Sequence, residues 1–320
     1  MTADPLDTLL PLLQCVGGGP DPADRCPGGL ARTADGLQCQ ACGTAYPTRA
    51  GVPVMRDIAD DRKDATLEGV YNEESDRTAA LAGGPWRDQA EPYWSVIRGL
   101  VADHRVTGPS LEVGCGLGLL ADTAPEYVGL DYSPYAVTAR GFEGYMRVAG
   151  DAQVLPFRDG VFGLVFTINC LEHVPDAARA LAEIDRVMRP GGHLLLKPAW
   201  NCTRYNTEGL PLRPYRELTL RQKAVKFLLP VLRSKPYKVA TRVPWRAYRR
   251  LVGRGELVYG RLTPSFDYLC QLSDSDAFSS LDPHECMRHF RHRGYTVLSH
   301  AGAARQVLAG HDVVILRKPG

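Results

Sequence analysis

The sequence predicts an α/β protein built on a mostly parallel sheet of seven strands, with helices on both faces of the sheet. From Ser110 onward, short apolar segments alternate with stretches of helical periodicity, which is the order of strand and helix units around a parallel sheet. The chain has 320 residues, and its 44% of hydrophobic residues can supply a core. The seven predicted strands lie near residues 110–114, 127–131, 146–151, 162–169, 192–197, 295–300 and 312–318.

Changes in composition divide the chain into four parts. Residues 1–58 are rich in Gly, Pro and Cys and predict a small irregular module that needs a staple. Residues 59–108 predict a helical lead-in or lid, and residues 109–200 with 283–320 form the predicted core. Between the two core parts, residues 201–282 interrupt the alternation and predict a helical cap insertion. One face of the lead-in helix carries Trp94, Ile97, Leu100 and Val101.

Neither a leader nor a membrane span is predicted. The N-terminal segment is acidic where a secretory signal is basic, and the longest apolar run, Ala224–Leu232, is too short to cross a bilayer. Nine cysteines without a regular framework favour reduced thiols and a metal over secreted disulfides. We therefore expect a cytoplasmic protein, with contact to a membrane surface as an open question.

A net charge of +2 conceals a basic block within an acidic protein. Residues 197–262 hold 16 Lys and Arg against 3 Asp and Glu, a balance of +13, while the remainder holds 22 against 33, a balance of −11. Within the block, residues 218–235 predict a basic amphipathic helix, interrupted near Pro230, that lays its apolar side on the sheet and its charges in water. The cations could instead hold an anionic substrate group, an anionic membrane or RNA, although scattered tyrosines form no RNA-binding motif.

The stretch "LEVGCGLG", residues 111–118, predicts a nucleotide-type cofactor site. Glycines after a strand let the backbone approach a ligand, and a following helix would offer its N-terminal amides. The dinucleotide fingerprint is G-x-G-x-x-G, whereas this loop has Leu119 in place of the last glycine. Asp131 can accept both hydroxyls of a ribose or can cap the next helix, so it indicates a nucleoside without naming it.

The whole stretch 111–197 resembles the class I S-adenosylmethionine-dependent methyltransferases of the type 11 kind. After "LEVGCGLG" come "GLDYSP", "GDAQVLPFRDGVFGLVFTINCLEHVPD" and "RVMRPGGHLLL", which resemble the later motifs of that family in order. The resemblance implies a Rossmann-like fold, S-adenosyl-L-methionine as cofactor and methyl transfer as the activity.

The resemblance also implies roles for particular residues in holding the cofactor. Glu112 would order the loop, and Asp131 would hold the ribose. Alternatively, the glycines could serve packing alone, and Asp151 could be a turn residue. The implied contacts are with the methionine part for Gly114, Cys115, Gly116 and Gly118, with the adenine for Tyr132, Asp151, Ala152 and Asn169, and as a lid for Tyr71, which could equally be a core residue.

His173 is the candidate general base. Methyl transfer is an in-line displacement in which positioning supplies most of the catalysis, but an oxygen nucleophile gains from a base. His173 follows the fourth core strand, at the carboxyl edge where such sheets bind ligands. A structural histidine is the alternative. Glu172 could assist through a hydrogen bond or a divalent metal, although we expect a solvated carboxylate in the first turn of a helix.

The N-terminal module resembles a zinc ribbon. The likeness, clearest at "LQCQACGTAYPTRAGVPVM", is to ribbon proteins that partner tRNA-modifying methyltransferases and to ribbons ahead of some rRNA guanine methyltransferases. Cys39 and Cys42 form one ligand pair; Cys15 remains from the other, Gly18 replaces its partner, and Cys26 could complete four thiolates. A metal-free vestige is the alternative. We expect packing roles for Cys115, Cys170, Cys202, Cys270 and Cys286.

These observations predict a methyltransferase that acts on a small metabolite or natural product, with oxygen favoured over nitrogen or carbon as the acceptor atom. The partner would be a small-molecule methyl acceptor. An anionic group on this acceptor would match the charge of the basic cap. An RNA base methyltransferase, an enzyme for a lipid-linked substrate at a membrane surface, and a non-catalytic scaffold subunit remain as alternatives. No feature predicts an oligomeric state.

Overall fold

A computed structural model of the chain describes residues 4–18, 24–56, 68–69, 76–197, 202–265, 274–308 and 313–320. Tyr71 and Cys270 lie outside the described residues. The chain forms two compact units, of which the first comprises residues 1–167, 178–194 and 320 and the second residues 168–177 and 195–319. The N-terminal module and the helical lead-in belong to the first unit, and the cap insertion shares the second with most of the C-terminal part.

The N-terminal module of the first unit is a small antiparallel sheet. Its strands are β1 (Leu30–Arg32), β2 (Gly36–Cys39), β3 (Ala45–Arg49) and β4 (Val52–Met55), and each pairs with the next in antiparallel fashion. The last strand also pairs in parallel with β7 (Met146–Gly150), in the register Val54 to Ala149. The module is therefore continuous with the central sheet rather than a separate body.

The central strands of the first unit are parallel, as predicted. They are β5 (Ser110–Val113), β6 (Tyr127–Asp131), β7 and β8 (Phe162–Ile168), with β9 (Met188–Lys197) beyond them. The order is β4, β7, β6, β5, β8, β9, and the pairs β5 with β6, β6 with β7 and β5 with β8 are parallel. The prediction of seven strands missed β1 to β4, because the Gly- and Pro-rich module has no apolar alternation that signals strands.

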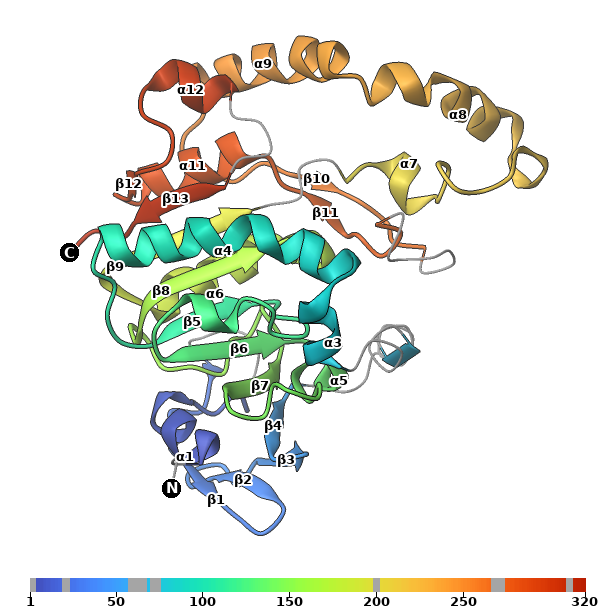
Figure 1. Ribbon diagram of the computed structural model, residues 1–320. Helices are drawn as coiled ribbons and strands as arrows, with labels where there is room; N and C mark the ends of the chain where they lie inside the picture. The colour runs from blue at the N-terminus through green and yellow to red at the C-terminus, as the bar shows by residue number, and fades with distance from the viewer. Residues whose placement is uncertain are drawn as a thin grey trace. The chain divides into compact units, whose positions relative to one another are not determined.

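Helices of the first unit pack against this sheet, so the α/β class is confirmed (Figure 1). The lead-in helix α4 buries Ile97 and Leu100, and the indole of Trp94 donates a hydrogen bond to the Leu119 carbonyl at 2.9 Å. The face predicted from its periodicity is thus the face that packs. The helical elements are α1 (Pro5–Leu9), η1 (Leu10–Leu12), α3 (Arg77–Ala82), α4 (Pro85–Asp103), η3 (Ala121–Thr123), α5 (Pro134–Val137) and α6 (Ala177–Val187).

A buried ion pair joins the N-terminal module to the core of the first unit. Arg25 Nη1 lies 2.8 Å from Glu183 Oε2, and both side chains are almost fully buried. The same carboxylate accepts hydrogen bonds from the Leu155 amide at 2.9 Å and from Arg186 Nη2 at 2.8 Å. Because several donors satisfy Glu183, the pair can be buried without an orphaned charge.

The second unit contains the cap insertion and the C-terminal elements. The helix predicted at 283–294 is α11, and the two C-terminal strands form an antiparallel pair. Cys202 and Cys286 are buried here, and Cys115 is buried in the first unit, as expected of packing residues. The elements are η4 (Leu171–His173), α7 (Arg204–Thr207), η5 (Tyr215–Glu217), α8 (Leu220–Leu232), α9 (Lys235–Val252), β10 (Gly260–Arg261), β11 (Ser279–Ser280), α11 (Pro283–His292), β12 (Thr296–Val297), α12 (Ala303–Leu308) and β13 (Val314–Arg317).

The helix α8 does not bury its apolar side as expected. Leu220, Phe227, Leu228 and Val231 are exposed, and Leu229 is its one fully buried residue. The expectation was wrong because amphipathic spacing defines two faces but not which of them meets the protein. No helix among the described residues is long and apolar enough to cross a bilayer.

Candidate functional site

The central strands bring three predicted segments to one edge of the first unit. Strands β5, β6 and β7 pair in parallel, so their carboxyl ends lie at the same edge. The glycine loop follows β5, Asp131 ends β6, and Asp151 follows β7. In open α/β sheets this edge is where ligands bind.

The glycine loop is a series of turns rather than the start of a helix. Gly114, Gly116 and Gly118 have φ angles of +79°, +50° and +68°, which favour glycine. The expected helix is replaced by the short 3₁₀ turn η3. The prediction failed because glycines in the left-handed conformation interrupt helical geometry. In addition, Pro125 stands only two residues before β6 begins, which leaves little room for a helix. The loop therefore acts through its own backbone and not through a helix N-terminus.

Asp131 holds the glycine loop directly. Its Oδ2 accepts a hydrogen bond from the Gly116 amide at 2.8 Å, and its Oδ1 accepts one from the Ser133 amide at 2.9 Å. The cap of helix α5 is Ser133, whose hydroxyl accepts from the Ala136 amide. Asp131 is thus not the helix cap itself, and it links the end of β6 to the loop after β5.

Gly118 is required by packing as well as by its backbone angle. A Cβ at this position would lie 2.2 Å from the ring of Phe142, far inside contact distance. Its carbonyl accepts a hydrogen bond from Nε of the buried Arg77 at 3.0 Å, and Arg77 Nη2 pairs with Asp122 at 3.2 Å. Arg77 was not predicted, because a single arginine in the lead-in carries no motif.

Glu112 is buried beneath the loop. Its carboxylate accepts a hydrogen bond from the Tyr127 hydroxyl on the neighbouring strand β6. Burial raises the pKa of Glu112 to about 8; the bond from Tyr127 opposes this shift, and the charge of Asp131 adds to it. The residue joins β5 to β6 below the loop, in keeping with the ordering role that the resemblance implied.

Tyr132 and Asp151 have partners within the first unit. The guanidinium of Arg56, just after β4, lies 4.0 Å from the centre of the Tyr132 ring. The Asp151 carboxylate accepts hydrogen bonds from the amide and side chain of Gln153, the closest at 2.8 Å, so Asp151 does form a turn. Ala152 beside it is buried. Sequence reasoning missed Arg56, which comes from the N-terminal module.

Asn169 belongs to the second unit and directly follows β8. Its side-chain oxygen accepts a hydrogen bond from Lys197 Nζ at 2.6 Å, and its backbone has a φ of +50°. Asparagine tolerates this left-handed conformation better than most residues. The structure therefore shows a local reason for asparagine at this position.

His173, in the same unit, forms an ion pair with Asp276. The Nδ1 atom of His173 lies 2.9 Å from Asp276 Oδ2, and the histidine side chain is 31% exposed. Because Nδ1 is engaged in this ion pair, Nε2 is the nitrogen left to exchange a proton. Asp276 was missed because it lies 103 positions further along the chain; the acidic "SDSD" after a basic insertion was its only signal.

Glu172 is buried, which contradicts the expected solvated carboxylate. Its Oε1 lies 3.7 Å from His173 Nε2, and no described residue donates a hydrogen bond to its Oε2. The expectation failed because residues 171–173 form a 3₁₀ turn covered by Phe278, whose amide donates to the Glu172 carbonyl at 2.7 Å. Burial raises the pKa of Glu172, a shift that the nearby His173 opposes.

The carboxylates around His173 change its protonation. Desolvation lowers the pKa of His173, but the hydrogen bond and charge of Asp276, with the charges of Glu172 and Asp274, outweigh it and raise the pKa to about 9. The buried thiol of Cys202 has a raised pKa because of burial and the charges of Asp274 and Glu172. The surroundings of His173 are thus acidic, although the insertion as a whole is basic.

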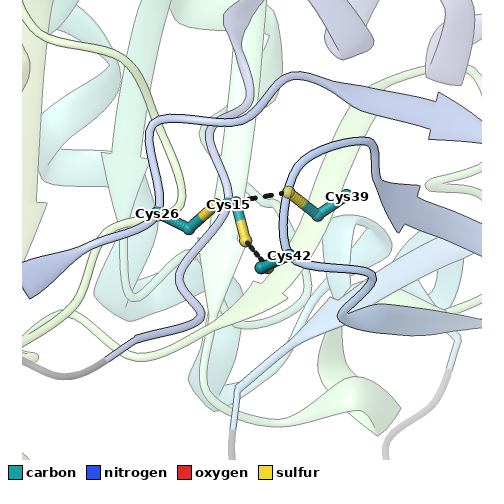
Figure 2. A group of neighbouring side chains, drawn as sticks. All are labelled: Cys15, Cys26, Cys39 and Cys42. Carbon is teal, nitrogen blue, oxygen red and sulfur yellow. Dashed lines mark hydrogen bonds between the residues drawn. The ribbon is translucent and has the colours of Figure 1, made fainter.

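The four cysteines singled out in the N-terminal module converge. The sulfurs of Cys15, Cys26, Cys39 and Cys42 all lie within 4.8 Å of one another. Figure 2 shows that the cysteines form two close pairs. The sulfurs of Cys15 and Cys42 are 3.6 Å apart, and those of Cys26 and Cys39 are 3.5 Å apart. A tetrahedral zinc with bonds of about 2.3 Å needs sulfurs about 3.8 Å apart. The four sulfurs could therefore coordinate a zinc ion after small adjustments. Cys26 supplies the fourth thiolate in place of the cysteine that Gly18 replaces.

Comparison with known families and proteins agrees with this geometry. Residues 111–196 match the family described as "Methyltransferase domain". Phthiotriol/phenolphthiotriol dimycocerosates methyltransferase 1 of Mycobacterium ulcerans is 30% identical over 225 residues, which cover 62% of this chain and 82% of that protein. Chloroplastic tocopherol O-methyltransferase of Arabidopsis thaliana is 32% identical over 135 residues, 38% of each chain.

A solved structure also shares sequence with this chain. The S-adenosylmethionine-bound amino pentose methyltransferase of Micromonospora echinaspora is 26% identical. The match covers 41% of this chain and 56% of that one, with a TM-score of 0.31. The similarity thus concerns part of each chain.

The buried Glu112 predicts a distinctive pH dependence of stability. Its pKa rises from an ordinary 4.5 to about 8 on folding, so the folded state holds a proton that the unfolded state has lost between these values. Stability contributed by this proton is complete below pH 4.5 and is lost as pH rises to about 8. We expect Glu112→Gln to flatten this fall in the free energy of unfolding, measured by urea denaturation across that range. The exposed Glu143→Gln serves as control, and parallel profiles for Glu112→Gln and the parent would contradict the prediction.

Proposed function

Because the chain belongs to the class I S-adenosylmethionine-dependent methyltransferases, we propose that it methylates a hydroxyl oxygen of a small metabolite or natural product, with His173 as general base. When bound, S-adenosylmethionine supplies an electrophilic methyl group. The acceptor oxygen would gain this methyl and give up its proton. The observation that carries the proposal is the ion pair between His173 Nδ1 and Asp276 at 2.9 Å.

We assign cofactor binding to the edge of the first unit. The glycine loop, held by Asp131, would approach the methionine part closely, as only a backbone without side chains can. The Asp131 carboxylate, which already accepts the Gly116 and Ser133 amides, could also accept the ribose hydroxyls, because a carboxylate oxygen can accept more than one hydrogen bond. Tyr132, with Arg56 over its ring, and Ala152 would line the adenine. Asp151 would bind its polar edge.

His173 would remove the hydroxyl proton of the acceptor. Its Nδ1 is occupied by Asp276, so the proton would be taken at Nε2. Asp276 orients the ring and stabilises the imidazolium that forms, as a positioning residue rather than a reacting group. The buried Glu172, 3.7 Å from Nε2, adds to that stabilisation. The Arabidopsis thaliana relative is an O-methyltransferase, which supports oxygen as the acceptor atom.

Variants of the pair test this proposal. With the pKa of His173 raised to about 9, kcat should rise with pH towards that value as the ring loses its proton. His173→Ala should lower kcat by about 10² to 10⁴. Asp276→Asn should move the rising limb to lower pH, since it removes the charge that favours the protonated ring.

The assay is transfer of labelled methyl groups to acceptors found by screening cell extract, with and without nuclease. Asp176→Asn, on the same connection, is the matched control and should keep the parent's pH profile. An unchanged kcat in His173→Ala would contradict the role of His173 as general base. An unchanged pH profile of kcat in Asp276→Asn would contradict the positioning role of Asp276. If nuclease treatment abolished the labelling, the methyl acceptor would be RNA and not a small molecule.

We also propose that Cys15, Cys26, Cys39 and Cys42 hold a structural zinc ion. The support is the convergence of the four sulfurs within 4.8 Å in a module too small to build a large core of its own. When bound, zinc would fix the loops that carry these thiolates. The adjoining β4 pairs with β7, so the ion would also support an edge of the central sheet.

Metal analysis tests the zinc proposal. Protein purified without chelators should contain about one zinc per chain, because structural sites hold the ion with four ligands. Cys39→Ser should lower both the zinc content and the melting temperature, whereas Cys170→Ser, outside the cluster, should leave the zinc content at the parent's level. Absence of stoichiometric zinc in the parent, or a full complement in Cys39→Ser, would contradict the assignment.

A further inference from the structure

We propose that helices α8 and α9 dock on the surface of an anionic lipid bilayer. The two helices follow one another in the second unit, with only Arg233 and Ser234 between them (Figure 1). Binding of a bilayer needs no methyl acceptor, so the inference goes beyond the proposed function and can fail independently of it.

Helix α8 presents an apolar stripe to solvent. Leu220 is 86% exposed and Phe227 is 76% exposed, and Leu228 and Val231 are exposed as well. With Ala224, these residues recur at the spacing of one helical face. The opposite side contacts the protein through Leu229, which is buried, and Lys226, which donates a hydrogen bond to the Pro211 carbonyl. Single exposed apolar residues are common on proteins, but a continuous stripe marks an interaction surface.

Helix α9 carries a second stripe, rich in aromatic residues. Its most exposed member is Leu251, at 85%, and the exposed rings of Trp245 and Tyr248 lie with their centres 5.7 Å apart and their planes tilted by 31°. Tryptophan and tyrosine are the residues that settle at the boundary between lipid and water. The stripe consists of Tyr237, Trp245, Tyr248, Leu251 and Val252, which the helical repeat places on one side.

The other side of α9 is held by buried arginines. Arg246 pairs with Asp282 at 3.0 Å, and Arg249 pairs with Glu285 at 3.1 Å. Both arginine side chains are almost fully buried; Arg246 lies opposite Tyr237 on the helix, and Arg249 lies about 120° around the helix from Tyr237. The polar side of α9 is therefore the one fastened to the protein, and the apolar side is the one presented outward.

The charge of this segment selects an anionic surface. Residues 220–252 contain ten Lys and Arg and no Asp or Glu. Arg221 and Lys223 lie on the two flanks of the α8 stripe, where long side chains can reach headgroups while the stripe enters the lipid. Such a combination of apolar face and basic flanks is typical of helices that lie in the membrane interface.

A bilayer fits these observations better than RNA or a second copy of the chain. RNA would use the cations and some rings, but it gives no reason to expose Leu220, Val231 and Leu251. A second copy would bring its own exposed cations against the same basic segment, and like charges repel across an interface. The lipid surface alone satisfies both the apolar stripes and the positive charge.

Cosedimentation with vesicles tests the proposal on the full chain. The parent should bind vesicles made of equal parts phosphatidylcholine and phosphatidylglycerol at low salt, more weakly at high salt, and poorly to phosphatidylcholine alone. The double variant Phe227→Glu with Leu251→Glu should bind at least about tenfold more weakly, since it removes two apolar side chains and adds two anions. Arg221→Gln and Lys223→Gln should each weaken binding by about fivefold.

The control is Leu308→Glu, which places the same charge at an exposed apolar position in α12, outside both stripes. It should bind vesicles as the parent does, and circular dichroism confirms that each variant is folded. Absence of binding to the anionic vesicles at low salt, or equal binding by the Phe227→Glu and Leu251→Glu variant, would overturn the proposal. Self-association in light scattering, or retention of RNA, without vesicle binding would overturn it in favour of a second copy or RNA.

Discussion

The carboxylate of Asp131 makes the contacts on which the arrangement of the proposed cofactor edge depends. One oxygen accepts from the Gly116 amide and the other from the Ser133 amide, so a single side chain fixes the loop after β5 against the end of β6. Below it, Glu112 and Tyr127 join the same two strands. Around it, Arg77 holds the Gly118 carbonyl. A loop of three glycines would otherwise have many conformations, and these contacts select one of them.

The N-terminal module is part of this arrangement rather than an appendage. Its strand β4 extends the sheet beside β7, and its Arg25 is buried against Glu183. Arg56, directly after β4, covers the ring of Tyr132. The cysteine cluster includes Cys39, the last residue of β2 in the same small sheet. A disturbance of the cluster would therefore reach, through β4, the edge that we propose binds the cofactor.

The sequence could predict those features whose residues lie close together in the chain. Glycines after a strand with an aspartate at the end of the next strand form a local pattern, and so does a cysteine pair with two residues between its members. The structure brings Gly116 and Asp131 into contact, and it brings Cys39 and Cys42 together with Cys15 and Cys26. Asp276, Arg77 and Arg56 could not be found in this way, because their partners are distant in the chain and a lone charged residue has no pattern. The outward faces of α8 and α9 were missed for a different reason. Periodicity identifies a stripe, but only the ion pairs of Arg246 and Arg249 show which side of α9 meets the protein.

The central claim is that the edge organised by Asp131 binds S-adenosylmethionine. Titration calorimetry of S-adenosylmethionine into the full chain, beside Asp131→Ala and the surface variant Asp159→Ala, tests it most directly. The account predicts about one site per chain in the parent and in Asp159→Ala, and binding at least about tenfold weaker in Asp131→Ala, since a charge-assisted hydrogen bond contributes about 1.5–3 kcal/mol. No binding by the parent, or an unchanged Kd in Asp131→Ala, would contradict it.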